Sequence, residues 1–291
     1  MKRSFFPVMA MSALTLAVVA ASCSTSKTAK SDPKQPVVLE YRFADGSEYS
    51  YAQTGTSEQY MDVQGQSVAV STGSYMGFTM KNLKAVQQQF EFDVVMDSLS
   101  LNVASPMMDN AGSMGSEVKG RSFRMSLSNN GKPLSMGDAS KIQVGNPMSG
   151  GGDLGATFSE IFPKLPLKEV SPGQTWAMSD TTEVKSSAME STTISKGDYT
   201  FTGYETVSGR KCVLITGTAE GSRYGKMNTQ GMDMVMTIPF KGTEKIWFDP
   251  SAGIVVKYES VMSGTGQIEV VGMGMTLDLS MSAKANLELL K

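Results

Sequence analysis

Apolar and polar residues alternate along several stretches of this chain. In residues 90–96, Phe90, Phe92, Val94 and Met96 are separated mainly by acidic residues. Residues 232–236 and 273–281 repeat the alternation with methionine and leucine at every second position. A period of two with one apolar face is typical of a half-buried β-strand. The pattern therefore predicts an all-β protein of antiparallel strands.

Aromatic residues and turn residues support the same interpretation. Tyr41, Phe43, Tyr49 and Tyr51 share one parity, which predicts that they lie on one face of a strand pair. Residues 129–131 (Asn-Asn-Gly) separate the apolar stretches 123–128 and 132–136, which is a hairpin signal. Residues 249–253 separate 245–248 from 254–258 in the same way.

The chain looks like two copies of one β unit, at residues 37–148 and 169–291. Each copy opens on a Gly turn beside an aromatic residue and closes on an aromatic strand with a Gly turn. Repeated turn chemistry in any β protein is the competing explanation. Long strands favour a half-barrel or a wide sandwich. We therefore expect one large curved antiparallel sheet, a single structural domain made from two similar halves.

A short helix is expected in the linker between the halves, residues 149–168. Asp153 can cap its N-terminus and Pro163 can end it. Its apolar residues recur at helical spacing and form one face: Leu154, Phe158, Ile161 and Phe162. The helix either forms a lid over an open β concavity or covers exposed sheet, and both interpretations stay open.

The N-terminus carries a secretory pattern. Lys2 and Arg3 precede a short apolar run, which ends in small residues before Cys23. The run is too short and too polar for a membrane span. These residues resemble the lipobox of bacterial lipoproteins, in which residues 1–22 would be the signal peptide and residues 23–36 a flexible tether. The resemblance implies that Cys23 carries fatty acyl chains such as palmitate and anchors the protein in a membrane.

The residues after Cys23 suggest a location. The sorting rule of the lipoprotein family implies the outer membrane, because Ser24 and not Asp follows the cysteine. No acidic run follows the cysteine, since the first acid is Asp32, and this favours the periplasmic face.

Composition excludes several classes of function. Removal of the signal leaves a net charge of (26 − 2) − 28 = −4, which argues against nucleic acid as a partner. The chain contains no histidine, which excludes Ser-His-Asp triads and histidine-ligated zinc or iron. Cys212 has no histidine to activate it and reads as a core residue. We therefore expect a protein without enzyme activity, metal or cofactor.

Methionine is unusually frequent, with 23 residues in the whole chain. Met232, Met234 and Met236 could be copper ligands, one buried face of a strand, or the lining of an apolar pocket. No histidine or second cysteine supports copper. With the four apolar residues of the predicted helix, these methionines form the candidate ligand-binding site.

Two tripeptides, 97–99 and 180–182, resemble the acceptor motif of periplasmic O-glycosylation in Bacteroidota. They make Ser98 and Thr181 candidate glycosylation sites.

The whole mature chain resembles a family of uncharacterised Bacteroidota lipoproteins. The resemblance rests on three segments, residues 41–49, 165–176 and 247–253, with Gln174 where the pattern usually has Asp. It implies a compartment and a fold and no activity. The architecture is also similar to half-barrel carriers of lipid and lipoprotein in cell envelopes.

Two non-enzymatic functions follow as the leading hypotheses, beside a third, a hydrolase, which predicts clustered carboxylates in a cleft and has Glu91, Asp93 and Asp97 as its acidic candidates. The first is an envelope lipoprotein that binds an apolar or amphipathic, lipid-like ligand in the curved sheet. The second is a structural or adaptor subunit of an outer-membrane assembly, with an envelope protein as its partner.

Overall fold

The computed structural model describes residues 35–63, 66–86, 88–105, 114–144, 152–185, 189–229 and 232–291. Residues 33–291 form one compact unit. Cys23, the signal peptide and most of the tether lie outside the described residues, as do residues 149–151 of the linker.

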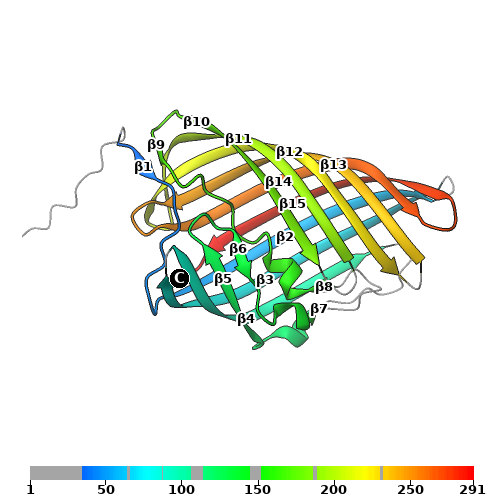
Figure 1. Cartoon of the computed structure of the whole chain (residues 1–291), viewed down its shortest axis with the longest axis horizontal. Helices are drawn as coiled ribbons and strands as arrows, with labels where there is room; N and C mark the ends of the chain where they lie inside the picture. Colours follow the sequence, from blue (N-terminus) through cyan, green and yellow to red (C-terminus); the bar gives the residue numbers. More distant parts are fainter. Residues whose placement is uncertain are drawn as a thin grey trace, which may run out of the picture. The chain divides into compact units, whose positions relative to one another are not determined.

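Eleven antiparallel strands form one large curved sheet that does not close on itself (Figure 1). The prediction of an all-β curved sheet is confirmed. The strands follow the order β10-β11-β12-β13-β14-β15-β2-β3-β4-β5-β6. The N-terminal half contributes β2 (Glu48–Val63), β3 (Gln66–Val86), β4 (Gln89–Ala104), β5 (Ser122–Ser128) and β6 (Pro133–Ser135). The C-terminal half contributes β10 (Thr175–Lys185), β11 (Met189–Val207), β12 (Arg210–Thr229), β13 (Met232–Asp249), β14 (Ile254–Val270) and β15 (Met275–Leu289).

Both halves therefore belong to one sheet, and they join where β15 pairs with β2. Two two-stranded pairs and three short helices accompany this sheet in the described part of the chain. They are β1 (Val37–Val38) with β9 (Glu169–Val170), β7 (Gln143–Val144) with β8 (Gly152–Asp153), and η1 (Ser116–Val118), η2 (Ala139–Lys141) and α1 (Leu154–Phe158).

The strand order explains why α1 lies against the sheet. β10 is the next strand of the large sheet after β6 along the chain, yet the two strands form opposite edges of that sheet. The residues between them must therefore cross the face of the sheet. We call residues 154–168 of this connection the crossing segment. The face of the sheet that it contacts is the concave face, and the opposite face is the convex face (Figure 1).

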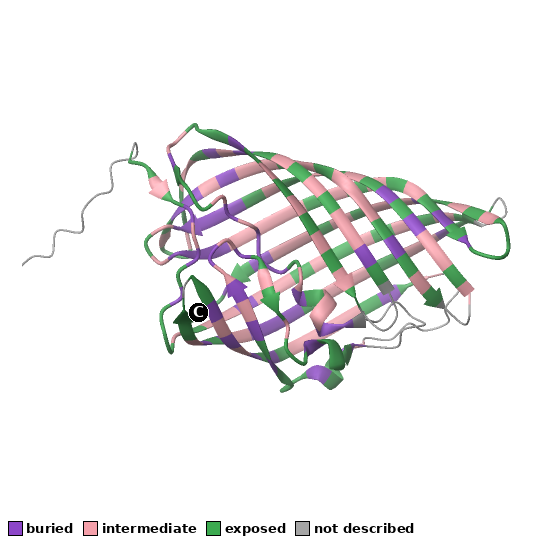
Figure 2. Ribbon diagram, viewed as in Figure 1, coloured by how far each residue is buried: buried purple, intermediate pink, exposed green. Residues whose placement is uncertain are grey.

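The main hydrophobic core lies between the crossing segment and the concave face, and strands of both halves of the sheet contribute to it. Phe158 contacts Phe78 on β3 and Phe123 on β5, with ring centroids 4.9 and 5.0 Å apart. Phe162 contacts Tyr51 on β2 at 5.3 Å. Buried aromatic pairs of this kind supply both apolar area and a preferred geometry. The concave-face residues within 76–80 of β3, 90–96 of β4 and 123–127 of β5 are consequently buried (Figure 2).

Small residues allow the C-terminal strands to lie close together on the concave side. A Cβ atom added at Gly221 would come within 2.1 Å of the Ile194 carbonyl oxygen, and one at Gly242 within 2.5 Å of the Val261 carbonyl oxygen. No side chain tolerates such distances, so glycine is required at both positions. Glycine at such sites is a known means of bending a sheet.

The hairpins predicted from turn residues are confirmed. Asn129 to Gly131 connects β5 to β6, and Gly131 has a φ of 87°, which favours glycine. Asp249 ends β13, and its Oδ1 accepts hydrogen bonds from the backbone amides of Ser251 and Ala252 at 2.9 and 3.1 Å.

Three local predictions need correction. Tyr41 and Phe43 are buried in the core as expected, but they lie outside any strand. Their segment pairs irregularly, for example through a hydrogen bond from the Tyr41 amide to the Asn129 carbonyl at 2.8 Å. Met273 belongs to an exposed turn before β15. The helix begins at its predicted cap but ends at Phe158, five residues before Pro163.

Asp153 caps this helix through a hydrogen bond from the Ala156 amide at 2.9 Å. Within the described ranges, no helix combines the length and the apolar character that crossing a membrane requires.

Candidate functional site

A cavity of about 610 Å³ lies between the crossing segment and the concave face of the C-terminal half. The crossing segment contributes one wall, which includes Phe162, Pro163 and Leu165. Strands β10 to β15 contribute the floor. The volume falls in the range of small-molecule sites, roughly 300–1,000 Å³.

The floor mixes apolar with polar side chains, and its apolar part is not covered by other parts of the described chain. Its apolar side chains are half-buried, in contrast to the fully buried core beside them. They are Met178, Ala219, Phe240, Met262, Met281, Ala283 and Ala285. Leaving such side chains partly exposed to water is unfavourable by about 25 cal/mol per Å² of apolar surface, so this surface is available for an apolar ligand.

The carboxylate of Glu244 lies among these apolar side chains of the floor. Glu244 occupies the concave-face parity of β13, two residues after Gly242 and two before Ile246. The Tyr199 hydroxyl donates a hydrogen bond to Glu244 Oε2 at 3.1 Å. Burial raises the pKa of Glu244 above its ordinary value, and hydrogen bonds from Tyr199 and Tyr258 offset only part of that rise. The environment therefore makes the charged carboxylate costly while no cation lies beside it.

The sheet register explains how Tyr199 reaches Glu244. Tyr199 on β11 pairs with Gly217 on β12, and Gly217 pairs with Glu244 on β13. The two backbones are thus two strand spacings apart, about 10 Å. The tyrosine ring lies over Gly217, because a Cβ added there would come within 2.4 Å of Tyr199 Cδ1. Gly217 therefore provides the space through which Tyr199 contacts the carboxylate.

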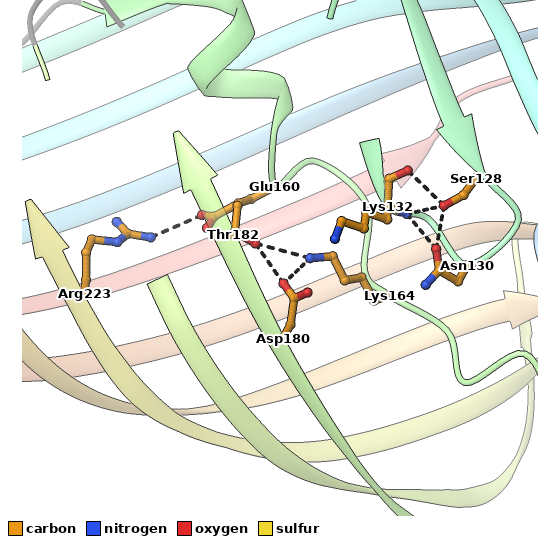
Figure 3. A network of polar contacts seen from close by, with 8 residues as sticks. All are labelled: Ser128, Asn130, Lys132, Glu160, Lys164, Asp180, Thr182 and Arg223. Carbon is orange, nitrogen blue, oxygen red and sulfur yellow. Dashed lines mark hydrogen bonds and ion pairs between the residues drawn. The ribbon is translucent and has the colours of Figure 1, made fainter. Parts of the chain in front are cut away.

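Other charged groups line the cavity as matched pairs (Figure 3). Lys164 of the crossing segment forms an ion pair with Asp180 on β10. Burial would raise the pKa of Asp180, but hydrogen bonds from Lys164 and Thr182 outweigh it and lower that pKa. Arg223 on β12 forms an ion pair with Glu160 at 3.2 Å.

The crossing segment is also held by its backbone. The Leu165 amide donates to the Asn130 carbonyl at 2.9 Å, and the Tyr41 hydroxyl donates to the Pro163 carbonyl at 2.8 Å. The segment therefore bridges the β5–β6 turn and β10, which belong to opposite edges of the sheet.

A second hollow, of about 660 Å³, lies over the convex face of β11 to β14. It is lined by exposed charged residues such as Lys196, Glu220 and Lys241, and Lys196 and Glu220 pair at 2.9 Å. Because these charges face water and satisfy one another, the concave cavity is the better candidate site.

The structure places the predicted ligand-binding residues in two locations. Leu154, Phe158, Ile161 and Phe162 are all buried in the main core, and Phe162 also lines the cavity. Met236 belongs to a separate apolar cluster near one end of the strands, and Met234 packs against that cluster. Met232 begins β13 and is half-buried. None of these methionines is among the residues that line the cavity, and ligand binding by them stays a prediction.

The remaining predicted sites are distributed over the chain. Ser98 is half-buried on β4, and Thr181 is exposed on β10. Glycosylation of either residue stays a prediction, as does lipidation of Cys23. Cys212 is fully buried, and burial raises the pKa of its thiol to about 11. Among the described residues, no group of His, Cys, Asp or Glu side chains could hold a metal ion.

Sequence reasoning missed Glu244, Tyr199 and Tyr258. A signal for Glu244 was present, because it shares the parity of Met236, Ile238 and Phe248, so a carboxylate interrupts an otherwise apolar strand face. The tyrosines could not be found in this way, since their proximity to Glu244 depends on the register between neighbouring strands.

No protein-family model matches the chain. No curated protein matches it either.

Several solved structures match the chain at low sequence identity and with TM-scores below 0.5. A structure of lipid–protein interactions in lipovitellin matches with a TM-score of 0.45 and 13% identity over 86% of this chain and 26% of that one. The hypothetical lipoprotein YmcC from Escherichia coli K12 matches with a TM-score of 0.28 and 12% identity over 82% and 84%. OccK5 of Pseudomonas aeruginosa matches with a TM-score of 0.30 and 6% identity over 85% and 100%. This chain thus spans about a quarter of the lipovitellin chain.

Proposed function

We propose that this protein is a non-enzymatic envelope lipoprotein that holds an amphipathic, lipid-like ligand in its concave cavity. In this proposal Cys23 anchors the protein in the outer membrane, with the body in the periplasm, and no cofactor takes part. The observation that carries the proposal is that uncovered apolar side chains on the floor of the cavity lie beside the half-buried carboxylate of Glu244.

The two kinds of lining suit the two parts of an amphiphile. Phe240, Met262 and Met281 offer an apolar surface to a hydrocarbon tail. Methionine suits this role because its flexible thioether adapts to tails of different shape. Glu244 and its tyrosines offer hydrogen-bonding groups to a head group. A cavity that needed only to be filled for stability would not contain the half-buried carboxylate of Glu244, since removing an unpaired charge from water is costly.

The test is whether the cavity holds lipid. The full-length lipoprotein is purified gently and examined by native mass spectrometry, and displacement of a fluorescent fatty acid is measured in parallel. We expect a co-purified lipid and saturable uptake of the probe. Met262→Trp should abolish both, because the indole would fill the cavity.

Ser263→Trp is the matched control. Ser263 is the next residue on β14 and lies on the convex face, so this variant should bind like the wild type. Circular dichroism confirms that both variants fold. If the wild type carries no lipid and takes up no probe, the ligand-binding proposal fails, and the adaptor function becomes the better hypothesis.

A further inference from the structure

We propose that the cavity recognises an ammonium group on its ligand, with Glu244 as counter-ion and Tyr199 and Tyr258 beside it. This inference rests on the proposed function and specifies the ligand as a cationic or zwitterionic amphiphile with an amine head.

The first argument is the balance of charge in the cavity. The cationic side chains that face it, Lys164 and Arg223, are each committed to a carboxylate, Asp180 and Glu160 respectively. Among the described lining residues, Glu244 is the carboxylate that has no cation beside it. A ligand that brings one positive charge would complete the set, since buried charges in proteins are normally paired.

Two further lysines in the lining do not alter this balance. Lys196 and Lys284 occupy convex-face positions of β11 and β15 and are exposed to solvent. Lys196 already pairs with Glu220 on that face. Neither ammonium group therefore compensates Glu244 across the sheet.

The second argument is the composition of the immediate surroundings of Glu244. The tyrosine hydroxyls of residues 199 and 258 act on the carboxylate and hold it in place. These hydroxyls are neutral, so they position the carboxylate without balancing its charge. An anionic head group would therefore be repelled by Glu244, whereas an ammonium group would be attracted to it.

The third argument is the direction of the apolar floor. Phe240 lies four residues before Glu244 on the same strand face, roughly 13 Å away at the rise of a β-strand. Met262 and Met281 lie beside this stretch on neighbouring strands. A single ligand can therefore place its amine at Glu244 and its tail along β13. The same amine chemistry occurs in amine-headed lipids and in free polyamines, which lack the tail.

The experiment compares ligands that share one tail. Binding of dodecylammonium, dodecanol and dodecanoate to the full-length protein is measured at pH 7.5 by displacement of a neutral fluorescent probe, below the micellar concentration of each. We expect the wild type to bind dodecylammonium at least about ten-fold more tightly than dodecanol, as a buried ion pair can supply. Dodecanoate should bind more weakly than dodecanol.

The decisive variant is Glu244→Gln. It keeps the shape of the side chain and removes the charge, so dodecylammonium and dodecanol should bind within about three-fold of each other. Glu220→Gln, on the convex face of β12, removes the same charge outside the cavity and should keep the wild-type preference. Tyr199→Phe retains the ring and loses one hydrogen bond, and should reduce the preference in part.

Two further probes separate the sources of the amine. Butylammonium and spermidine test a head without a tail, and vesicles of phosphatidylethanolamine or phosphatidylglycerol test a membrane lipid. Uptake from phosphatidylethanolamine vesicles alone identifies an amine-headed lipid, whereas spermidine binding identifies a free polyamine. Both results support the ammonium site.

Other outcomes overturn the inference. Equal binding of the three dodecyl compounds would refute the ammonium site and leave lipid binding intact. A preference that survives in Glu244→Gln would refute the role of Glu244. Failure of all three compounds to bind would instead refute the proposed function itself.

Discussion

Side chains on the concave face are buried to different extents in two regions of the sheet. On β3 to β5, side chains such as Phe78, Phe92 and Met96 are completely buried beneath the crossing segment. On β11 to β14, Phe240 and Met262 remain half-buried and line the cavity. One curved sheet thus provides a filled core at one side and an open site at the other. The difference teaches that large side chains packed beneath the crossing segment fill one region, whereas small side chains and the path of the segment leave a cavity in the other.

The largest expected effect comes from replacing one phenylalanine with alanine in each of the two regions. Phe158→Ala removes the ring between Phe78 and Phe123 and should reduce the free energy of unfolding by about 3–5 kcal/mol. Phe240→Ala should cost only about 1 kcal/mol because its ring is already half-exposed. Urea denaturation of both variants measures the contrast. Equal losses would show that the floor of the cavity is part of the stabilising core.

A second change affects the position of the tyrosine over the sheet. Gly217→Val places side-chain atoms where the Tyr199 ring lies and should destabilise the protein by about 1–3 kcal/mol while displacing the hydroxyl from Glu244. Gly203→Val is the control, since the space around Gly203 is open. Melting temperatures and tyrosine fluorescence report the two effects. A Gly217 variant as stable as the control would contradict the close packing.

A third change should stabilise the protein. Because the folded-state pKa of Glu244 is raised, its contribution to stability is fully present below its unfolded pKa of about 4.3 and is lost as pH rises through the folded value. Glu244→Gln avoids this loss, so we expect it to be more stable than the ligand-free wild type at pH 8 by roughly 1 kcal/mol. The difference should vanish near pH 4.

The pH dependence can be assigned to Glu244 because the groups that face it do not titrate in the tested range. They are Tyr199 and Tyr258, whose own pKa values are raised by burial and stay above the tested range. Asp180 and Glu160 act on these tyrosines from further away. Thermal unfolding of both proteins from pH 4 to 8 checks the prediction, and a difference that does not vary with pH would refute it.

The smallest expected effect concerns the attachment of the crossing segment. Lys164→Ala should cost about 0.5–1 kcal/mol at pH 7, because the Lys164–Asp180 pair is only partly buried. The pKa of Asp180 is lowered in the folded state, so this difference should be present above the unfolded value of about 3.9 and shrink as pH falls through the folded value. Faster hydrogen exchange of the Leu165 amide would accompany it.

Lys141→Ala serves for comparison. Its pair with Asp138 is highly exposed, so its loss should change the stability very little. If both lysine variants behave alike, Lys164 does not hold the crossing segment.

Features that depend on neighbouring residues in the chain were predicted correctly, and features that depend on contacts between distant segments were not. Period-two alternation in residues 90–96 predicted β4 and its buried face correctly, because alternation follows from backbone geometry alone. The cap at Asp153 was equally local. The parity of Tyr41 and Phe43 misled, since their burial comes from contacts with Phe162 and Phe92 and not from a strand. The predicted helix was too long because the apolar spacing was counted to Phe162, whereas Ile161 and Phe162 are buried without helical geometry.

By itself, the sequence determined an all-β protein with long antiparallel strands, two halves joined by a short helix, and chemistry without histidine. These properties depend on local spacing and composition. Tertiary structure alone decided that β15 pairs with β2, that the crossing segment packs on the concave face, and that Tyr199 lies across Gly217 from Glu244. The physical reason is strand pairing and register, which decide which side chains meet across the sheet and which no pattern within a single strand encodes.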